Sequence, residues 1–293
     1  SYGYFTFEVD GYSKFIHGVA PLFATGTSSR PDFIWRGMSD PSWSLQSSLA
    51  RFASNEVRFG WPAWQKTVSQ LTISHLMEFM RNARGLGLLQ RSHDLIFAEL
   101  QKLTTERQFS FLDILNRMTP EQQDLTHELF AVGQHYGLLT PFLDWTCVPL
   151  IALYFALHEA DSRFDGVGNR VVYALNRNQV ELLCPQTSTT GPDGILIRES
   201  MAHDNPRIVP QAGLFTFVPS YKAVEEWAVD SGRRAGLNDT PLLIRFLIRN
   251  EGRNACLREL ASCGVHSRTV FPDRFGAALH TNFELEVRAK SSK

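Results

Sequence analysis

Side chains that can bind an anion and carry a proton gather in one short stretch of this 293-residue sequence. Residues Gly133 to His158 read GQHYGLLTPFLDWTCVPLIALYFALH, with polar residues and structure breakers in the first half and an apolar run in the second. The polar half holds Gln134, His135, Thr140, Asp144 and Thr146. His135 and Asp144 would form a general acid–base pair if their side chains came within hydrogen-bond reach of each other.

The apolar run from Pro149 to Leu157 predicts a buried helix with Pro149 in its first turn and Thr146 or Asp144 near its N-terminus. The run is too short to span a bilayer, which needs roughly 20 apolar residues. The positive end of such a helix favours anionic groups, phosphates among them. The polar segment is therefore either a binding segment or the lead-in to a core helix that Asp144 caps.

Arg36 and Gly37 form a second candidate feature, at the end of a brief apolar strand predicted from Phe33 to Trp35. The arginine presents a planar fork of donors suited to phosphate or carboxylate, and the glycine permits close backbone approach by a ligand. An internal salt bridge of Arg36 is the alternative interpretation. Weaker polar candidates follow later in the chain: Arg207, Gln211 and Pro272-Asp273.

Periodicity along the chain predicts an α+β fold in a single domain over residues 1–293. Helical spacing of apolar residues predicts helices at 12–23, 64–84, 92–105, 119–130, 254–263 and 274–280, with Thr119 and Pro120 starting the fourth. β-Branched and aromatic runs predict strands at 5–9, 33–35, 170–175, 195–197, 214–218, 242–248, 265–271 and 283–287. A mostly helical N-terminal half, with an insertion-like helical region at about 55–131, is thus expected to pack on a mixed sheet. That sheet is formed largely by a strand-rich region at about 165–293.

Composition and charge narrow the classes of function. The net charge of -1 gives no overall basic field for nucleic acid, although a local patch would still allow such a partner. The four cysteines contain no CxxC pair, which argues against a zinc site and a disulfide framework. With neither a signal peptide nor a transmembrane segment in the sequence, we expect a cytoplasmic protein with no membrane partner and no metal. The common phosphate-loop, dinucleotide and hydrolase motifs do not occur.

Several candidate residues stand in motifs that resemble the FRG domain family, named for its Phe-Arg-Gly triplet. The motifs are Trp35-Arg36-Gly37, Trp43 to Leu49, QHYGLLTPFLDWT with PLIALYFA, Pro206-Arg207-Ile208, Gln211 to Thr216, and Val270 to Asp273. They occur in the family's order from about residue 33 to residue 279. The sequence departs from the family pattern at Trp35, where Phe or Tyr is usual, and at Pro141-Phe142, where Thr-Arg-Leu is usual.

The chain is also similar, more distantly, to ADP-ribosyltransferases of the arginine-serine-glutamate type. This similarity implies an ADP-ribosyltransferase-like core with NAD as the substrate. Arg36 would hold the NAD pyrophosphate, Thr140 or Thr146 would support the nicotinamide ribose, and His135 and Asp144 would orient ribose hydroxyls. The implied NAD-binding set is Arg36, Gly37, Gln134, His135, Thr140, Asp144, Thr146 and Arg207.

The catalytic set implied by the same similarity is Arg36, His135, Gln211 and Glu286. The reaction needs a carboxylate or amide that binds the ribose 2′-hydroxyl and stabilises oxocarbenium-like charge as nicotinamide leaves. Gln211 falls where the third motif begins but has no carboxylate. Glu284 and Glu286 supply an E-x-E pattern on one face of the predicted last strand. The catalytic acid is therefore one of three residues: Gln211, Glu284 or Glu286.

The resemblance thus implies an NAD-dependent ADP-ribosyltransferase that modifies a nucleic acid, such as DNA, or a protein, in a setting such as a bacterial toxin or a phage-defence effector. The alternative is a non-catalytic module whose cleft of Arg36, His135 and Asp144 captures a nucleotide, nucleic acid or peptide. A metal-independent hydrolase that uses His135 and Asp144 is a third hypothesis. The most useful observation is whether Arg36, His135, Asp144 and Gln211 converge on one concave pocket and whether a carboxylate joins them, after which soaking with NAD would test the chemistry.

Overall fold

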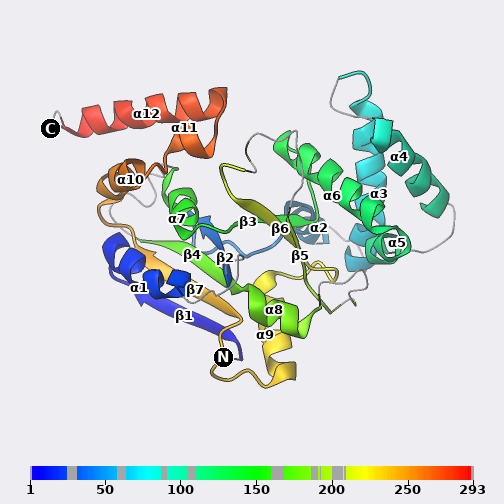
Figure 1. Ribbon diagram of the computed structural model, residues 1–293, viewed down its shortest axis with the longest axis horizontal. Helices are drawn as coiled ribbons and strands as arrows, with labels where there is room; N and C mark the ends of the chain where they lie inside the picture. The colour runs from blue at the N-terminus through cyan, green and yellow to red at the C-terminus, as the bar shows by residue number, and fades with distance from the viewer. Residues whose placement is uncertain are drawn as a thin grey trace.

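A seven-stranded mixed sheet forms the centre of the described part of the chain (Figure 1). The computed structural model describes residues 2–24, 32–57, 64–86, 91–104, 110–159, 168–185, 191, 193–199, 207 and 209–291. The strands are β1 (Tyr4–Val9), β2 (Phe33–Met38), β3 (Phe142–Thr146), β4 (Asn169–Asn176), β5 (Leu196–Glu199), β6 (Gly213–Phe217) and β7 (Leu243–Arg249). They lie in the order β1-β7-β4-β2-β3-β6-β5, with β1 parallel to β7 and the other neighbouring pairs antiparallel. The predicted α+β class is confirmed.

Helices cover the middle of the sheet on both faces. Consecutive residues of a strand point to opposite faces, so Trp35 packs in one apolar cluster and Ile34 in another. The face of Trp35 carries α1 (Tyr12–Ala24), α7 (Pro149–Leu157), α10 (Arg253–Ser262) and α11 (Ser267–Val270). The face of Ile34 carries α8 (Arg177–Leu183) and α9 (Val224–Ala235). The unbroken apolar run of β4 from Val171 to Leu175 is the pattern that burial on both faces requires.

Five helices from the first half of the chain form a helical lobe at one end of the sheet, on the right of Figure 1. They are α2 (Ser48–Val57), α3 (Trp64–Asn82), α4 (Arg91–Thr104), α5 (Phe111–Arg117) and α6 (Pro120–His135). The apolar core of the lobe includes Phe142 of β3 and Phe217 of β6, which attaches the lobe to the sheet. α6 begins as predicted, with Thr119 as its N-cap and Pro120 in the first turn, but it runs on to His135.

The polar segment before α7 contains a regular strand. Its polar residues and structure breakers had suggested an irregular conformation. Residues Phe142–Thr146 form β3, which pairs with β2 through Trp35 and with β6 over its whole length. α7 begins with Pro149 in its first turn, as predicted. The N-cap of α7 is Val148, which makes no side-chain cap bond, so the prediction that Asp144 caps this helix was wrong.

The C-terminal segment is helical at both places where the sequence predicts a late strand. Residues Ser267–Val270 form α11, and α12 (Arg274–Ser291) runs through the region of the second predicted strand. Asp273 accepts a hydrogen bond from the amide of Gly276 (3.1 Å) in the first turn of α12. Leu279 and Phe283, one turn apart, pack against the apolar cluster of α7 and α10. Neither α12 nor any other helix of the described residues combines the length and apolarity needed to cross a membrane.

Candidate functional site

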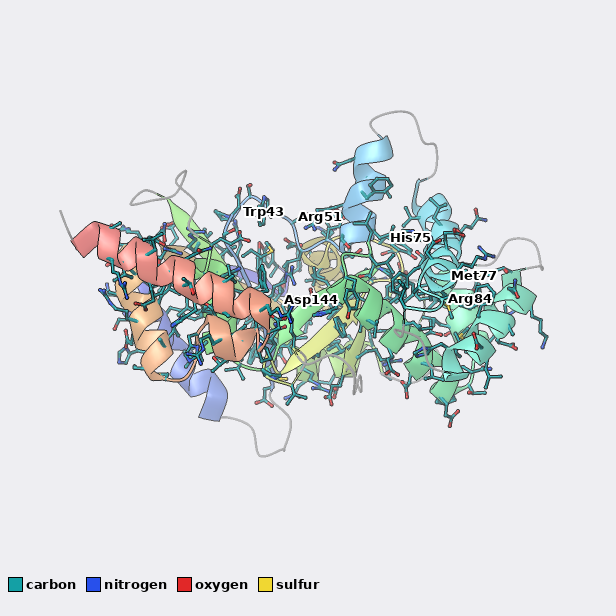
Figure 2. The ribbon with its side chains drawn as sticks, turned by 90° about the horizontal axis from the view of Figure 1, so that it is seen from above. Trp43, Arg51, His75, Met77, Arg84 and Asp144 are labelled. Atoms are coloured by element: carbon teal, nitrogen blue, oxygen red, sulfur yellow. The ribbon has the colours of Figure 1, made fainter. Side chains whose placement is uncertain are left out.

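A cleft of about 300 Å³ lies where the helical lobe meets the sheet. Its lining comes from three strands, α6, α7 and the segments before β6 and α12: Trp35, Arg36, Gly37, Ala131, Gln134, His135, Asp144, Trp145, Thr146, Phe155, Arg207, Gln211, Gly213, Leu214, Phe215 and Phe271. Figure 2 shows Asp144 between α12 and the helical lobe. Arg36, His135, Asp144 and Gln211 all line this one cleft, so the convergence that favours a functional site is present.

Arg36 enters the cleft from β2 and has one buried donor, Nε, that no described residue accepts from. Its Nη1 donates to the main-chain oxygen of Asp144 at 2.6 Å and lies 3.9 Å from Oδ2 of the same residue. Its Nε is buried and has no hydrogen-bond partner among the described residues. Burial lowers the pKa of Arg36, and the charge of Asp144 opposes this. Because a buried unpaired donor costs about 1–3 kcal/mol, this guanidinium is suited to receive the anionic oxygens of a ligand.

Gly37 allows β2 to pack closely against α7. A Cβ at this position would lie 1.7 Å from the carbonyl oxygen of Ala152 and 2.7 Å from the amide nitrogen of Ala156. Both atoms belong to the backbone of α7. The close backbone approach that the glycine predicts is therefore made by a helix, although Gly37 also lines the cleft.

Asp144 is the one carboxylate among the residues that line the cleft, all of which belong to the described part of the chain. It is the exposed position of β3, and 55% of its side chain is accessible through the cleft. Burial between the cleft walls raises the pKa of Asp144, whereas the charge of Arg36 and the amide of Gln134 act in the opposite direction. A carboxyl with a raised pKa beside an arginine with spare donors is typical of functional sites.

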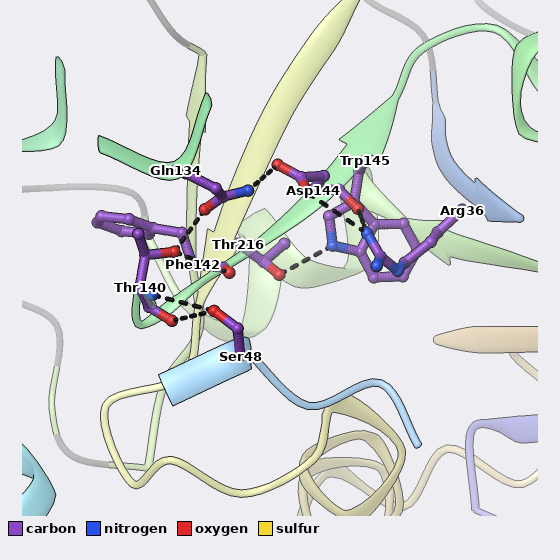
Figure 3. Close-up of polar contacts among 8 residues, drawn as sticks. All are labelled: Arg36, Ser48, Gln134, Thr140, Phe142, Asp144, Trp145 and Thr216. Carbon is purple, nitrogen blue, oxygen red and sulfur yellow. Dashed lines mark hydrogen bonds and ion pairs between the residues drawn. The ribbon is translucent and has the colours of Figure 1, made fainter. Parts of the chain in front are cut away.

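A chain of hydrogen bonds leads from the interior to Asp144 (Figure 3). Nε2 of Gln134 donates to Oδ1 of Asp144, and Oε1 of Gln134 accepts from the hydroxyl of Thr140. Thr140 is fully buried and does not line the cleft. Thr140 therefore lies behind Gln134 and not at the lining, where the ribose contact implied for it would be made.

Thr146 and Gln211 line the cleft, and both form hydrogen bonds that join separate segments of the chain. The hydroxyl of Thr146 donates to the main-chain oxygen of Gln211 at 2.6 Å and accepts from the amide of Val148 at 3.1 Å. The side-chain amide of Gln211 donates to the carbonyl oxygen of Val270 at 3.1 Å. These bonds connect β3 to the segment before β6, and that segment to α11.

His135, the last residue of α6, lines the cleft beside Gln134. Partial burial and then the charge of Arg207 lower the pKa of His135, against the opposing charge of Asp273, which favours the neutral imidazole. No hydrogen bond joins His135 to Asp144 in the described structure, and the amide partner of Asp144 is Gln134 instead. The direct pair that the hydrolase hypothesis requires is not formed.

Arg207 is held by an ion pair and two aromatic rings. Its Nη2 and Nε lie 2.6 and 2.8 Å from Oδ2 of Asp273. Its guanidinium stands over the rings of Phe271 and Phe275, at 5.1 and 5.3 Å from their centroids. Burial would raise the pKa of Asp273, but the amide of Gly276 and the charge of Arg207 hold it below its usual value. The motif residues on either side of Arg207 lie outside the described part of the chain.

Three phenylalanines supply apolar walls, a role that the sequence motifs containing them did not indicate. They are Phe155 of α7, Phe215 of β6 and Phe271 before α12. The rings of Phe155 and Phe271 meet edge to face at 5.8 Å. In the sequence, Phe215 shows only as one member of an apolar strand and Phe155 only as one member of an apolar run. Aromatic faces of this kind suit a flat ligand ring.

Glu284 and Glu286 do not line the cleft, because both belong to α12 rather than to a strand. Glu286 forms an ion pair with Arg253 of α10 at 2.9 Å. Arg253 in turn donates to the carbonyl oxygens of Leu157 (2.6 Å) and His158 (3.0 Å) at the end of α7. This contact ties α12 and α10 to the end of α7, away from the cleft lining where the catalytic role implied for Glu286 would be performed.

One known family model matches a part of the chain that contributes residues to this cleft. Residues 31–164 match the family model of the FRG domain. The matched residues include Arg36 and Gly37, the end of α6, β3 and α7, whereas Arg207, Gln211 and Phe271 lie beyond them. No curated protein and no solved structure matches the chain.

Proposed function

We propose that this protein is an NAD-dependent ADP-ribosyltransferase whose reaction takes place in the cleft. The observation that supports the proposal is that Arg36, whose Nε has no partner among the described residues, lies beside Asp144, the carboxylate of the lining. Arg36 binds the NAD pyrophosphate through charge-assisted hydrogen bonds. A cleft of about 300 Å³ with phenylalanine walls has the size and lining of a small-molecule site.

Asp144 stabilises the charge that develops when the glycosidic bond breaks. The bond between C1′ of the ribose and the nicotinamide nitrogen opens, and its electron pair leaves with nicotinamide, which becomes neutral. Positive charge then spreads over C1′ and the ring oxygen, where a nearby carboxylate that also binds the 2′-hydroxyl lowers the barrier. In this proposal Asp144 is the group that stabilises the oxocarbenium-like charge, because it is the carboxylate that lines the cleft. It takes the place of Gln211, Glu284 and Glu286, the candidates from the sequence.

The second half of the reaction transfers the ribosyl group to an acceptor. A nucleophile of the acceptor forms a bond to C1′ and loses its proton, which passes to the neutral imidazole of His135. We propose a nucleic acid or a protein as the acceptor, and a toxin or phage-defence effector as the setting. The support for this acceptor class and setting is the resemblance to ADP-ribosyltransferases.

Nicotinamide release from NAD by the purified protein tests the proposal, with water or a cellular extract as the source of acceptor. We expect Asp144→Asn to lower kcat by about 100- to 1,000-fold, because one electrostatic partner of the transition state is lost, while NAD still binds. Arg36→Gln should instead weaken NAD binding. Asp10→Asn, at an exposed ion pair beyond the cleft lining, is the matched control and should behave as the wild type.

Three outcomes separate the hypotheses. Turnover that depends on Asp144 and binding that depends on Arg36 would support the transferase. Binding of NAD without release of nicotinamide, in every acceptor mixture, would make the cleft a nucleotide-binding module and overturn the catalytic proposal. Neither binding nor a shift of the melting temperature at millimolar NAD would remove NAD as the ligand.

A further inference from the structure

The carboxylate of the cleft is oriented from behind by two uncharged residues. Gln134 of α6 donates to Oδ1 of Asp144, and Thr140 donates to the other end of the same amide (Figure 3). Thr140 is fully buried, so water does not compete for its hydroxyl. Its backbone is fixed to the start of α2, because its amide donates to Ser48 Oγ at 3.0 Å and its carbonyl accepts from Leu49 at 3.1 Å.

The direction of each bond in this chain follows from the chemistry of the groups. An ionised carboxylate only accepts hydrogen bonds, so Gln134 must turn its NH₂ toward Asp144 and its oxygen toward Thr140. The hydroxyl of Thr140 must then donate. A glutamine amide is nearly symmetric in shape, and without a donor at its oxygen end it can turn over and present that oxygen to Asp144. The hydroxyl therefore selects the orientation that suits an ionised Asp144.

We infer that Thr140, acting through Gln134, is a positioning residue that holds the Asp144 carboxylate ionised and aimed into the cleft. The inference rests on the proposed function for its catalytic consequence. Thr140 itself touches no ligand, because it lies behind the lining. Its effect is to keep one oxygen of Asp144 bound to Gln134, which leaves Oδ2 for the reacting ribose.

The opposite arrangement is available only to a protonated Asp144. Gln134 would then turn over, accept from the carboxyl and donate to Thr140, and the hydroxyl would point to the carbonyl oxygen of Phe142. That oxygen is 3.5 Å away, at the limit of hydrogen-bond distance, so the reversed chain is the weaker one. Arg36 of β2 is the charged group that faces Asp144, and His135 and Arg207 are the other titratable groups of the lining.

Thr140→Val and Thr140→Ser form a matched pair that tests this inference. Valine keeps the shape of threonine without the hydroxyl, whereas serine keeps the hydroxyl. In Thr140→Val we expect the pKa of Asp144, read from its carboxyl ¹³C resonance, to rise, and kcat for nicotinamide release to fall by about 5- to 10-fold, the loss of one hydrogen bond. KM should change less than kcat, and Thr140→Ser should restore both readouts.

An unchanged pKa of Asp144 in a folded Thr140→Val protein would overturn the inference. If that variant does not fold, Gln134→Met removes the same amide from a partly exposed position, and its Asp144 pKa decides the question in the same way. The two proposals fail separately. A wild type that does not release nicotinamide refutes the transferase, while the pKa of Asp144 still shows whether Thr140 acts on it.

Discussion

Replacing Gly37 with alanine tests the packing that carries Arg36 into the cleft. The added Cβ would meet the carbonyl oxygen of Ala152 at 1.7 Å and the amide nitrogen of Ala156 at 2.7 Å. Both are backbone atoms of α7, so no side-chain rotation can relieve the overlap. Ordinary contact begins at 3.4 Å, so β2 and α7 must separate by about 1.7 Å at this point.

The cost of this separation follows from how firmly α7 is enclosed. α7 has nine residues and seven of them are buried. Overpacking in a core costs about 1–3 kcal/mol and occasionally more, and here only the backbone can give way, so we expect about 3 kcal/mol. For a domain of this size that corresponds to a fall in melting temperature of about 6–12 °C. Calorimetry or urea unfolding of Gly37→Ala measures it.

Gly18→Ala is the matched control for this experiment. Gly18 is an exposed residue of α1 with nothing within 4 Å of an added Cβ. Alanine should therefore leave stability unchanged or raise it by up to about 1 kcal/mol, because glycine is the poorer helix former. A Gly37→Ala protein that melts at or above the wild-type temperature would refute the packing argument and return Gly37 to the role of a ligand contact.

Two further substitutions test the ionisable groups outside the cleft. Burial lowers the pKa of His127 to about 3, and neither ring nitrogen has a hydrogen-bond partner among the described residues. Because folding lowers this pKa, the folded state becomes less stable as the pH falls below the usual pKa of histidine. The wild type should thus lose about 2 kcal/mol relative to His127→Phe between about pH 8 and pH 5, and a constant difference in urea titrations would contradict this. Glu286→Gln should lower the free energy of unfolding by about 1–3 kcal/mol, because the buried guanidinium of Arg253 would lose its carboxylate partner. Glu78→Gln, at an exposed ion pair, should lower it by less than about 1 kcal/mol. Nicotinamide release by folded Glu286→Gln should equal that of the wild type, and its loss would return the acid role to Glu286.

Elements with strong local signals could be predicted from the sequence. α6 starts at the Thr119-Pro120 cap, and β4 follows its run of β-branched residues. β3 could not be predicted, because the sequence FLDWT shows no strand pattern by itself and is extended through pairing with β2 and β6. The C-terminal strand was wrong for a related reason: the alternation of FELEV suits a strand, but packing of Leu279 and Phe283 on one face makes it helical.

The sequence predicted which residues lie together in the cleft, but it did not predict what each of them contacts. Arg36, His135, Asp144 and Gln211 do line one cleft. The sequence offers Gln211, Glu284 and Glu286 as the catalytic acid, the two glutamates through an E-x-E pattern, and the helical course of α12 brings Glu286 to Arg253. The chain of bonds from Thr140 to Asp144 could not be predicted, because it depends on how α6 ends against β3.

We propose that NAD binds with its pyrophosphate at Arg36 and its reacting ribose at Asp144. A crystal structure of the Asp144→Asn protein with NAD tests it most directly, since this substitution should retain the substrate without turning it over. We predict pyrophosphate oxygens about 3 Å from the Arg36 guanidinium, with C1′ of the nicotinamide ribose facing position 144. NAD bound outside the cleft, or a cleft left empty at saturating NAD, would contradict the claim.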